Sequence, residues 1–82
     1  MKFLANCRFL KLEIAKSKKN NKEYGVLFIL DDDSVSHKFY VFDELKNKFL
    51  NAGLDEFQTI VVAFAVSEKD DSWKVDIENF EP

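Results

Sequence analysis

The stretch VSHKFYVFDELKNKFLNAG, residues 35–53, decides the fold, because its periodicity changes at Asp43. Polar and apolar side chains alternate from Val35 to Phe42, and a period of two is typical of a strand. After Asp43 the apolar side chains recur at helical spacing instead. The stretch therefore predicts a strand that is followed directly by a helix.

The predicted helix has recognisable ends. Leu45 and Phe49 are four residues apart on one helical face, and Leu50 widens this apolar stripe. The carboxylate of Asp43 is well placed to cap the free N–H groups of the first turn, and Gly53 is well placed to end the helix in a left-handed conformation. We expect a helix of about three turns.

Four further strands flank this stretch. Side chains of mixed polarity alternate over residues 8–16, and residues 24–30 are apolar on both faces, as in a central strand. The polar, lysine-rich residues between them predict a hairpin loop. After the helix, the apolar residues 57–67 and the alternating residues 73–78 predict two more strands.

The order β-β-β-α-β-β restricts the choice of fold. A β-grasp domain has two strands before its helix, so one of the first three strands would be surplus. A five-stranded Greek-key barrel with its helix between strands three and four fits both the count and the order, and this arrangement is the OB-fold. We expect residues 1–82 to form a single, mainly β, OB-fold-like domain.

The charge is unevenly distributed along the chain. The formal net charge is -3, yet residues 1–23 hold seven Lys or Arg and two Glu, a net of +5. Residues 24–82 hold five basic and thirteen acidic side chains, a net of -8. A fold that gathers the first segment on one face would therefore carry a basic patch on an acidic body.

Other features favour a cytoplasmic protein. The single Cys cannot form an internal disulfide, and the N-terminus lacks the apolar core of a signal peptide. The longest apolar run, Ile60 to Val66, is far below the ~20 residues that span a bilayer. We expect no membrane partner.

Catalytic chemistry has little support. The one histidine, His37, shares a strand face with apolar residues, which favours a histidine packed in the barrel or at its rim over a general base. Cys7 has no histidine nearby in the sequence and is expected to be a buried filler. Residues 31–33 are three aspartates, but the distal glutamate of a calcium loop is missing, so we expect a solvated turn. We expect no enzyme activity, cofactor or metal.

Binding of single-stranded nucleic acid needs cations along a groove and aromatic faces on which bases stack. If Leu10, Leu12 and Ile14 face the interior, Phe9 and Lys11 face outward. By the same alternation, Phe28 on the second strand and Lys38 and Tyr40 on the third also face outward. The candidate binding residues are Arg8, Phe9, Lys11, Lys16, Lys18, Lys19, Lys22, Phe28, Lys38, Tyr40, Trp73 and Lys74.

Structural explanations compete at several of these positions. Phe9 and Phe28 are more readily explained by cover from residues 1–6 or from a second subunit, because exposed apolar patches often mark subunit contacts. Trp73 shares a face with Val75 and is expected first to pack at the barrel rim, and only second to stack on a base.

The layout resembles small single-domain OB-fold proteins of the single-stranded DNA-binding type from bacterial phages and mobile elements. The lysine-rich hairpin 16–22, the apolar strand 24–30, the capped helix after Phe42 and the final hairpin with Trp73 carry the resemblance. The resemblance extends over nearly the whole chain, but it is a similarity of architecture and includes no diagnostic sequence motif. It implies non-catalytic binding of single-stranded DNA, or RNA, with little sequence preference. Strand edges also invite pairing into a homodimer.

The acidic side chains of residues 24–82 support a second interpretation. The chain would then be an acidic interaction module, or a small phage-type inhibitor, that presents carboxylates to a basic groove of a protein partner. In a third interpretation the barrel is only a scaffold subunit of a larger assembly, because a fold does not determine a function.

Overall fold

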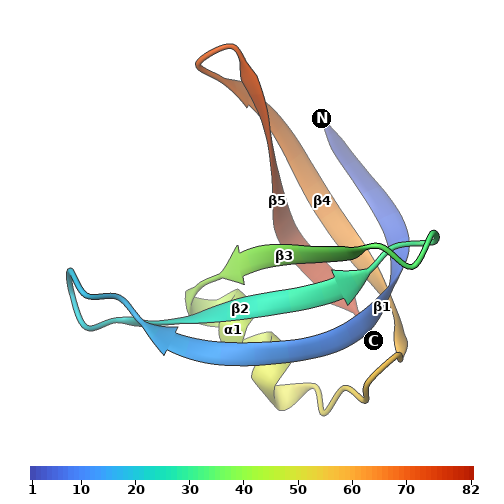
Figure 1. Ribbon diagram of the computed structural model, residues 1–82, viewed down its shortest axis with the longest axis horizontal. Coiled ribbons are helices and arrows are strands. Elements are labelled where there is room, and N and C mark those ends of the chain that lie inside the picture. The colour runs from blue at the N-terminus through green and yellow to red at the C-terminus, as the bar shows by residue number, and fades with distance from the viewer.

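The computed structural model describes the whole chain, residues 1–82. Its elements follow the predicted order: β1 (Lys2–Lys16), β2 (Glu23–Leu30), β3 (Ser36–Val41), α1 (Asp43–Asn51), β4 (Thr59–Lys69) and β5 (Ser72–Glu81). The strands form one antiparallel sheet in the order β3-β2-β1-β4-β5. The sheet curls into a half-barrel (Figure 1), which confirms the predicted mainly β, OB-fold-like arrangement.

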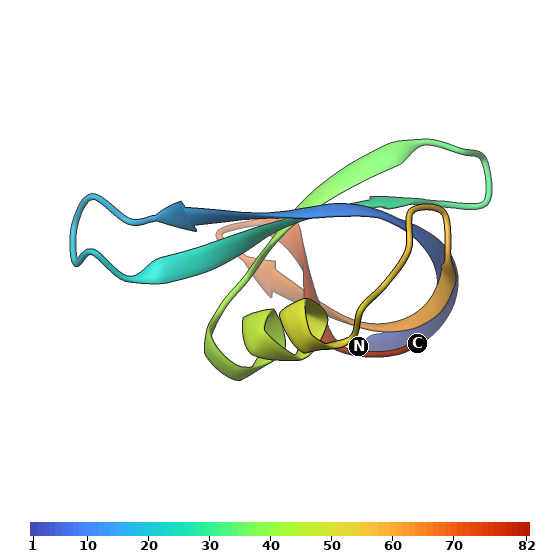
Figure 2. The same cartoon turned by 90° about the horizontal axis from the view of Figure 1, so that it is seen from below.

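The long strand β1 belongs to both halves of the sheet. Residues 2–8 pair with β4, and residues 8–16 pair with β2. Figures 1 and 2 show how β1 curves from one half into the other. The predicted start of this strand at Arg8 is therefore wrong. The alternation before it is inconspicuous, because the inward-facing Ala5 and Cys7 are small side chains.

A β-bulge changes which side chains of β1 face inward. Phe9 pairs with Ile29, but Lys11 pairs with Phe28, so Leu10 is an extra residue on β1. Phe9 therefore points into the core and is only 9% exposed, and its predicted outward direction is wrong. Beyond the bulge Lys11 faces outward and Leu12 packs against the core, as predicted. Ile14, which was predicted to face the interior with Leu10 and Leu12, is 41% exposed.

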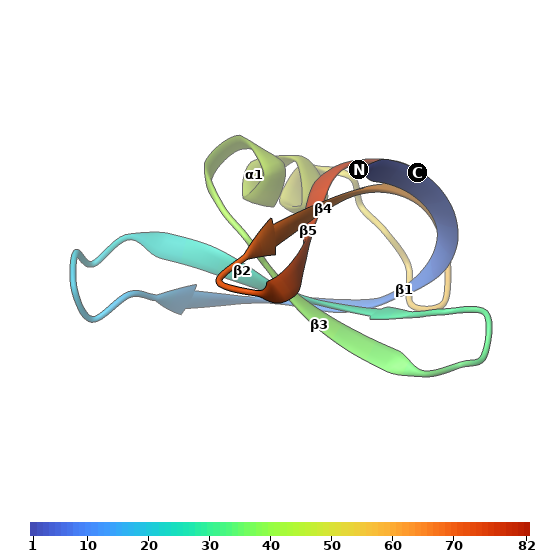
Figure 3. The same cartoon turned by 90° about the horizontal axis from the view of Figure 1, so that it is seen from above.

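The core lies between the two halves of the sheet and α1. Its buried side chains are Cys7, Phe9, Leu27, Ile29, Val41, Phe49, Ile60, Val62, Phe64, Ile77 and Phe80. Phe49 of α1 stacks on Phe80 of β5 with 3.8 Å between the ring centroids. This contact holds α1 beside the β4–β5 half (Figure 3). The nine residues of α1 are too few and too polar for a helix that crosses a membrane.

The helix begins differently from the prediction. The residue before it, Phe42, is extended and forms no side-chain cap. Asp43 is the first residue inside the helix and does not cap the first turn. Its carboxylate binds the ammonium group of Lys22 at 3.1 Å. At the other end Gly53 has φ 62°, the left-handed conformation that was predicted. Leu50 is exposed and adds nothing to the apolar stripe.

The aspartate-rich segment after β2 is a turn, as predicted. One carboxylate oxygen of Asp31 accepts the backbone N–H groups of Asp33 and Val35 at 2.9 and 3.0 Å. The other lies 2.7 Å from Nε2 of His37, at the start of β3. The hydrogen bond with His37, followed by those from the backbone, lowers the pKa of Asp31 below its ordinary value.

The close packing around Gly25 gives a test of the fold. A Cβ atom at Gly25 would lie 2.8 Å from Cγ2 of Val41 and 2.9 Å from Cδ1 of Leu12. We expect Gly25→Ala to lower the free energy of unfolding by ~1–3 kcal/mol, because overpacking strains the neighbours. Urea unfolding followed by circular dichroism measures this change, with Ser36→Ala as the exposed control. A Gly25→Ala protein as stable as the parent would contradict the packing described.

The lowered pKa of Asp31 predicts how its charge contributes to stability in acid. Its ionised form is favoured in the folded state, so its contribution is present at neutral pH and is lost as the pH falls below ~4 through the folded-state pKa. Asp31→Asn keeps an oxygen acceptor for the turn but removes the charge. We expect the unfolding free energy of this variant to fall less on acidification than that of the parent. Asp33→Asn is the control, and an Asp31→Asn protein that loses as much stability as the parent would refute the role of this charge.

Candidate functional site

Two lysines with a phenylalanine between them form a row across three strands, on the outer face of the half-barrel. Lys11 lies opposite Phe28, and Phe28 lies opposite Lys38. Opposed residues of paired strands project from the same face of a sheet, so these side chains are neighbours. The Lys11 ammonium group lies 4.8 Å from the centroid of the Phe28 ring. The strand pairing therefore places three of the predicted binding residues side by side.

A strip of aromatic rings runs beside this row. Tyr40 is 53% exposed, and the Lys38 ammonium group lies 5.7 Å from the centroid of its ring. The ring of Tyr24 meets that of Tyr40 edge-on at 5.9 Å and lies 6.0 Å from that of Phe42. Tyr24 and Phe42 are absent from the predicted set. The alternation of β3 could have identified Phe42, because it has the same parity as Lys38 and Tyr40.

The hairpin between β1 and β2, together with the last residue of β1, carries three lysines that form no ion pair. It projects from the body of the molecule (Figure 2). Lys11 and Lys22 form ion pairs with Glu13 and Asp43, at 2.8 and 3.1 Å. The predicted lysines that form no ion pair are Lys16, Lys18, Lys19 and Lys38. Three of these four belong to the hairpin and the end of its first strand.

A groove between β3 and β5 places Lys74, which is distant in the sequence, near Lys38 and Tyr40. Lys74 and Asp76 of β5 line it together with Lys38 and Tyr40 of β3, and its volume is about 320 Å³. The ammonium group of Lys74 lies 3.9 Å from a carboxylate oxygen of Asp76. The predicted cation at Lys74 thus lies beside the exposed Tyr40 ring, although it is already weakly paired.

Three predicted residues lie apart from this cluster. Phe9 belongs to the core and offers no face to a ligand. Arg8 donates a hydrogen bond to the Ser34 hydroxyl at 2.8 Å, in the turn at the other end of β2. Trp73 is 68% exposed near the tip of the β4–β5 hairpin, so its predicted packing at the rim is wrong. Its side chain projects from the opposite face of β5 to that of Lys74.

No protein-family model, curated protein or solved structure matches this chain.

Proposed function

We propose that this chain binds single-stranded nucleic acid, chiefly DNA, without catalysis and with little preference for sequence. The observation that supports this proposal is the outer-face cluster of Lys11, Phe28, Lys38 and Tyr40. These residues combine ring faces for bases with cations for phosphates, on the strands that OB-folds use for oligonucleotides.

Tyr40 is the principal stacking residue in this proposal. Its ring is exposed, and the edge-on contact with Tyr24 restrains it before a base arrives. A stacked base contributes ~1–3 kcal/mol whatever its identity, because every base has a flat π-face. Lys38 lies beside the ring and forms no ion pair, so its charge is available to a neighbouring phosphate.

The acidic body opposes the approach of a polyanion, but only over a limited distance. At an ionic strength of 0.1 M, exposed charges farther apart than about 10 Å are largely screened from each other. The local field of Lys16, Lys18 and Lys19 then decides whether a phosphate is attracted to the hairpin. The proposal therefore requires that binding weakens as salt increases.

The alternative partner is a protein with a basic groove. It is favoured by the many carboxylates that form no ion pair, among them Glu68, Asp70 and Asp71 around the β4–β5 turn. In that case the chain would not bind an oligonucleotide.

An oligonucleotide titration separates these two functions. We expect the anisotropy of a fluorescein-labelled oligo-dT to rise to a plateau as protein is added at low salt, and the affinity to fall at high salt. A duplex of the same length is the control and should bind less tightly, because its bases are not free to stack. An unchanged anisotropy at about tens of micromolar protein in low salt would reject the proposal and leave the protein-interaction function.

Substitution of the two tyrosines tests the stacking surface. Tyr40→Ala is expected to weaken oligo-dT binding about 10-fold, within the ~1–3 kcal/mol range of a stacked base. Tyr24→Ala should have a smaller effect, because Tyr24 is partly buried and acts through its contact with Tyr40. The same anisotropy titration measures both variants, and equal losses would show that Tyr40 is not the principal stacking residue.

Charge reversal tests the hairpin. Lys18→Glu combined with Lys19→Glu should weaken binding and reduce the salt dependence, by up to ~1.4 in log affinity per log salt if each lysine contacts one phosphate. The control is Lys2→Glu combined with Lys69→Glu, which changes the net charge equally but lies outside the hairpin. If the two double variants have the same slope, the hairpin does not contact the strand.

A further inference from the structure

A second site lies inside the half-barrel, away from the outer face. It is an apolar cavity of about 380 Å³. The first half of β1, the turn after β2, and residues of β2, β3, β4 and β5 line it. Its phenylalanine walls are continuous, because Phe64 stacks on Phe3 at 5.0 Å and lies 5.6 Å from Phe39. The volume falls near the lower end of the ~300–1,000 Å³ that small-molecule sites occupy.

The ionisable groups that line this cavity, apart from the Cys7 thiol, come from the turn after β2 and from β3. They are Asp31, Asp32 and His37. Asp31 and His37 are committed to each other at 2.7 Å, and the second oxygen of Asp31 accepts two backbone N–H groups. The Asp32 carboxylate has neither a hydrogen bond nor an ion pair. The cavity therefore combines an apolar interior with one uncommitted negative charge.

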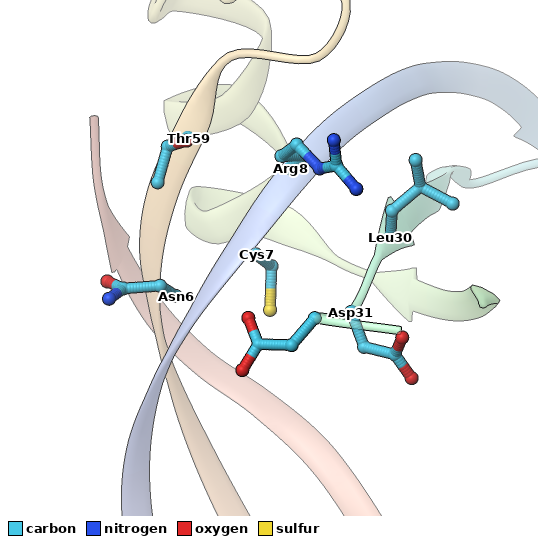
Figure 4. A pocket seen from close by; sticks show the side chains of 7 residues that line it. Asn6, Cys7, Arg8, Leu30, Asp31 and Thr59 are labelled. Atoms are coloured by element: carbon cyan, nitrogen blue, oxygen red, sulfur yellow. The ribbon is translucent and has the colours of Figure 1, made fainter. Parts of the chain in front are cut away.

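The arginine beside this cavity forms no ion pair with the Asp32 carboxylate. Arg8 lines a smaller adjoining cavity, of about 180 Å³, which also contacts Cys7, Asp31 and Asp32 (Figure 4). Its guanidinium group is directed to the Ser34 hydroxyl and forms no ion pair.

The aspartates that line the two cavities also affect the thiol of Cys7. Cys7 is buried and lines both cavities. Burial raises the pKa of its thiol, and the negative charges of Asp32 and Asp31 raise it further. The same field that disfavours a thiolate attracts a cationic ligand and repels an anionic one.

We infer that this cavity binds a small organic amine, with an apolar body among the rings of Phe3, Phe39 and Phe64 and a protonated amino group at the Asp32 carboxylate. Apolar burial supplies the attraction for the body, and the carboxylate and nearby ring faces favour the cation over an anion of the same shape. This inference does not depend on the proposed function, because the cavity shares no residue with the cluster of Lys11, Phe28, Lys38 and Tyr40.

Three probes of similar shape but different charge test the inference on the full chain. They are 2-phenylethylamine, the neutral 2-phenylethanol and the anionic 3-phenylpropanoate, each followed by ¹⁵N–¹H NMR. We expect the amine to cause saturable shifts at residues such as Cys7, His37 and Phe39, with an affinity of ~1–10 mM typical of so small a ligand. The alcohol should bind more weakly, and the anion at least ~10-fold more weakly than the amine. Equal affinities, or no saturable shift with the amine, would overturn the inference.

Asp32→Asn removes the charge and preserves the shape of the side chain. We expect it to weaken amine binding by ~3- to 10-fold and to leave binding of 2-phenylethanol unchanged. Asp33→Asn is the matched control, because Asp33 lies in the same turn but does not line the cavity. Equal amine affinities in the parent and in Asp32→Asn would reject the assigned role of Asp32. The NMR spectrum of each variant shows whether it is folded. Oligo-dT binding, measured in parallel, tests the proposed function of the outer face separately.

Discussion

The whole structure depends on one strand that is hydrogen-bonded to a different neighbour along each half of its length. β1 passes from β4 to β2 at Arg8, which is the last residue paired with one strand and the first paired with the other. The extra residue Leu10 lies two residues later, and a bulge bends a strand and increases its twist. At the same point the backbone of Phe9 is tied to the segment before β4, through bonds with Phe57 and Gln58. The curl of the sheet thus originates where β1 changes partner.

Both candidate sites are consequences of this bend. On the outside it leaves Lys11 opposite Phe28, so that the cation-aromatic row faces outward although Phe9 faces inward. On the inside it lets the two halves of the sheet diverge, and no hydrogen bonds join β3 to β5. The space between the halves is only partly filled, and the cavity walled by Phe3 and Phe64 remains. One distortion of the backbone therefore produces two surfaces of different chemistry.

The sequence was sufficient to predict the elements whose periodicity is simple. The order of strands and helix follows from the change of period, and the lysine-rich hairpin from its polar composition. The outward directions of Phe28, Lys38 and Tyr40 follow from alternation. Alternation could not reveal the bulge, because an extra residue inserted between Phe9 and Lys11 leaves no compositional mark.

Other features depend on contacts between segments that are distant in the sequence. The ion pair between Lys22 and Asp43 forms only because the folded hairpin brings the two residues together. The proximity of Lys74 to Tyr40 likewise depends on how β5 lies against β3. Local patterns carry no information about such pairs. Alternation therefore gave the outward directions of Lys11, Phe28, Lys38 and Tyr40 but the wrong direction for Phe9.

A map of the amide shifts that oligo-dT induces in ¹⁵N-labelled protein tests whether the outer-face cluster binds single-stranded nucleic acid. We expect the largest shifts along the pairing of Lys11, Phe28 and Lys38 and at Tyr40, extending into the hairpin. Shifts confined to residues away from these strands, or none at saturating oligonucleotide, would contradict it.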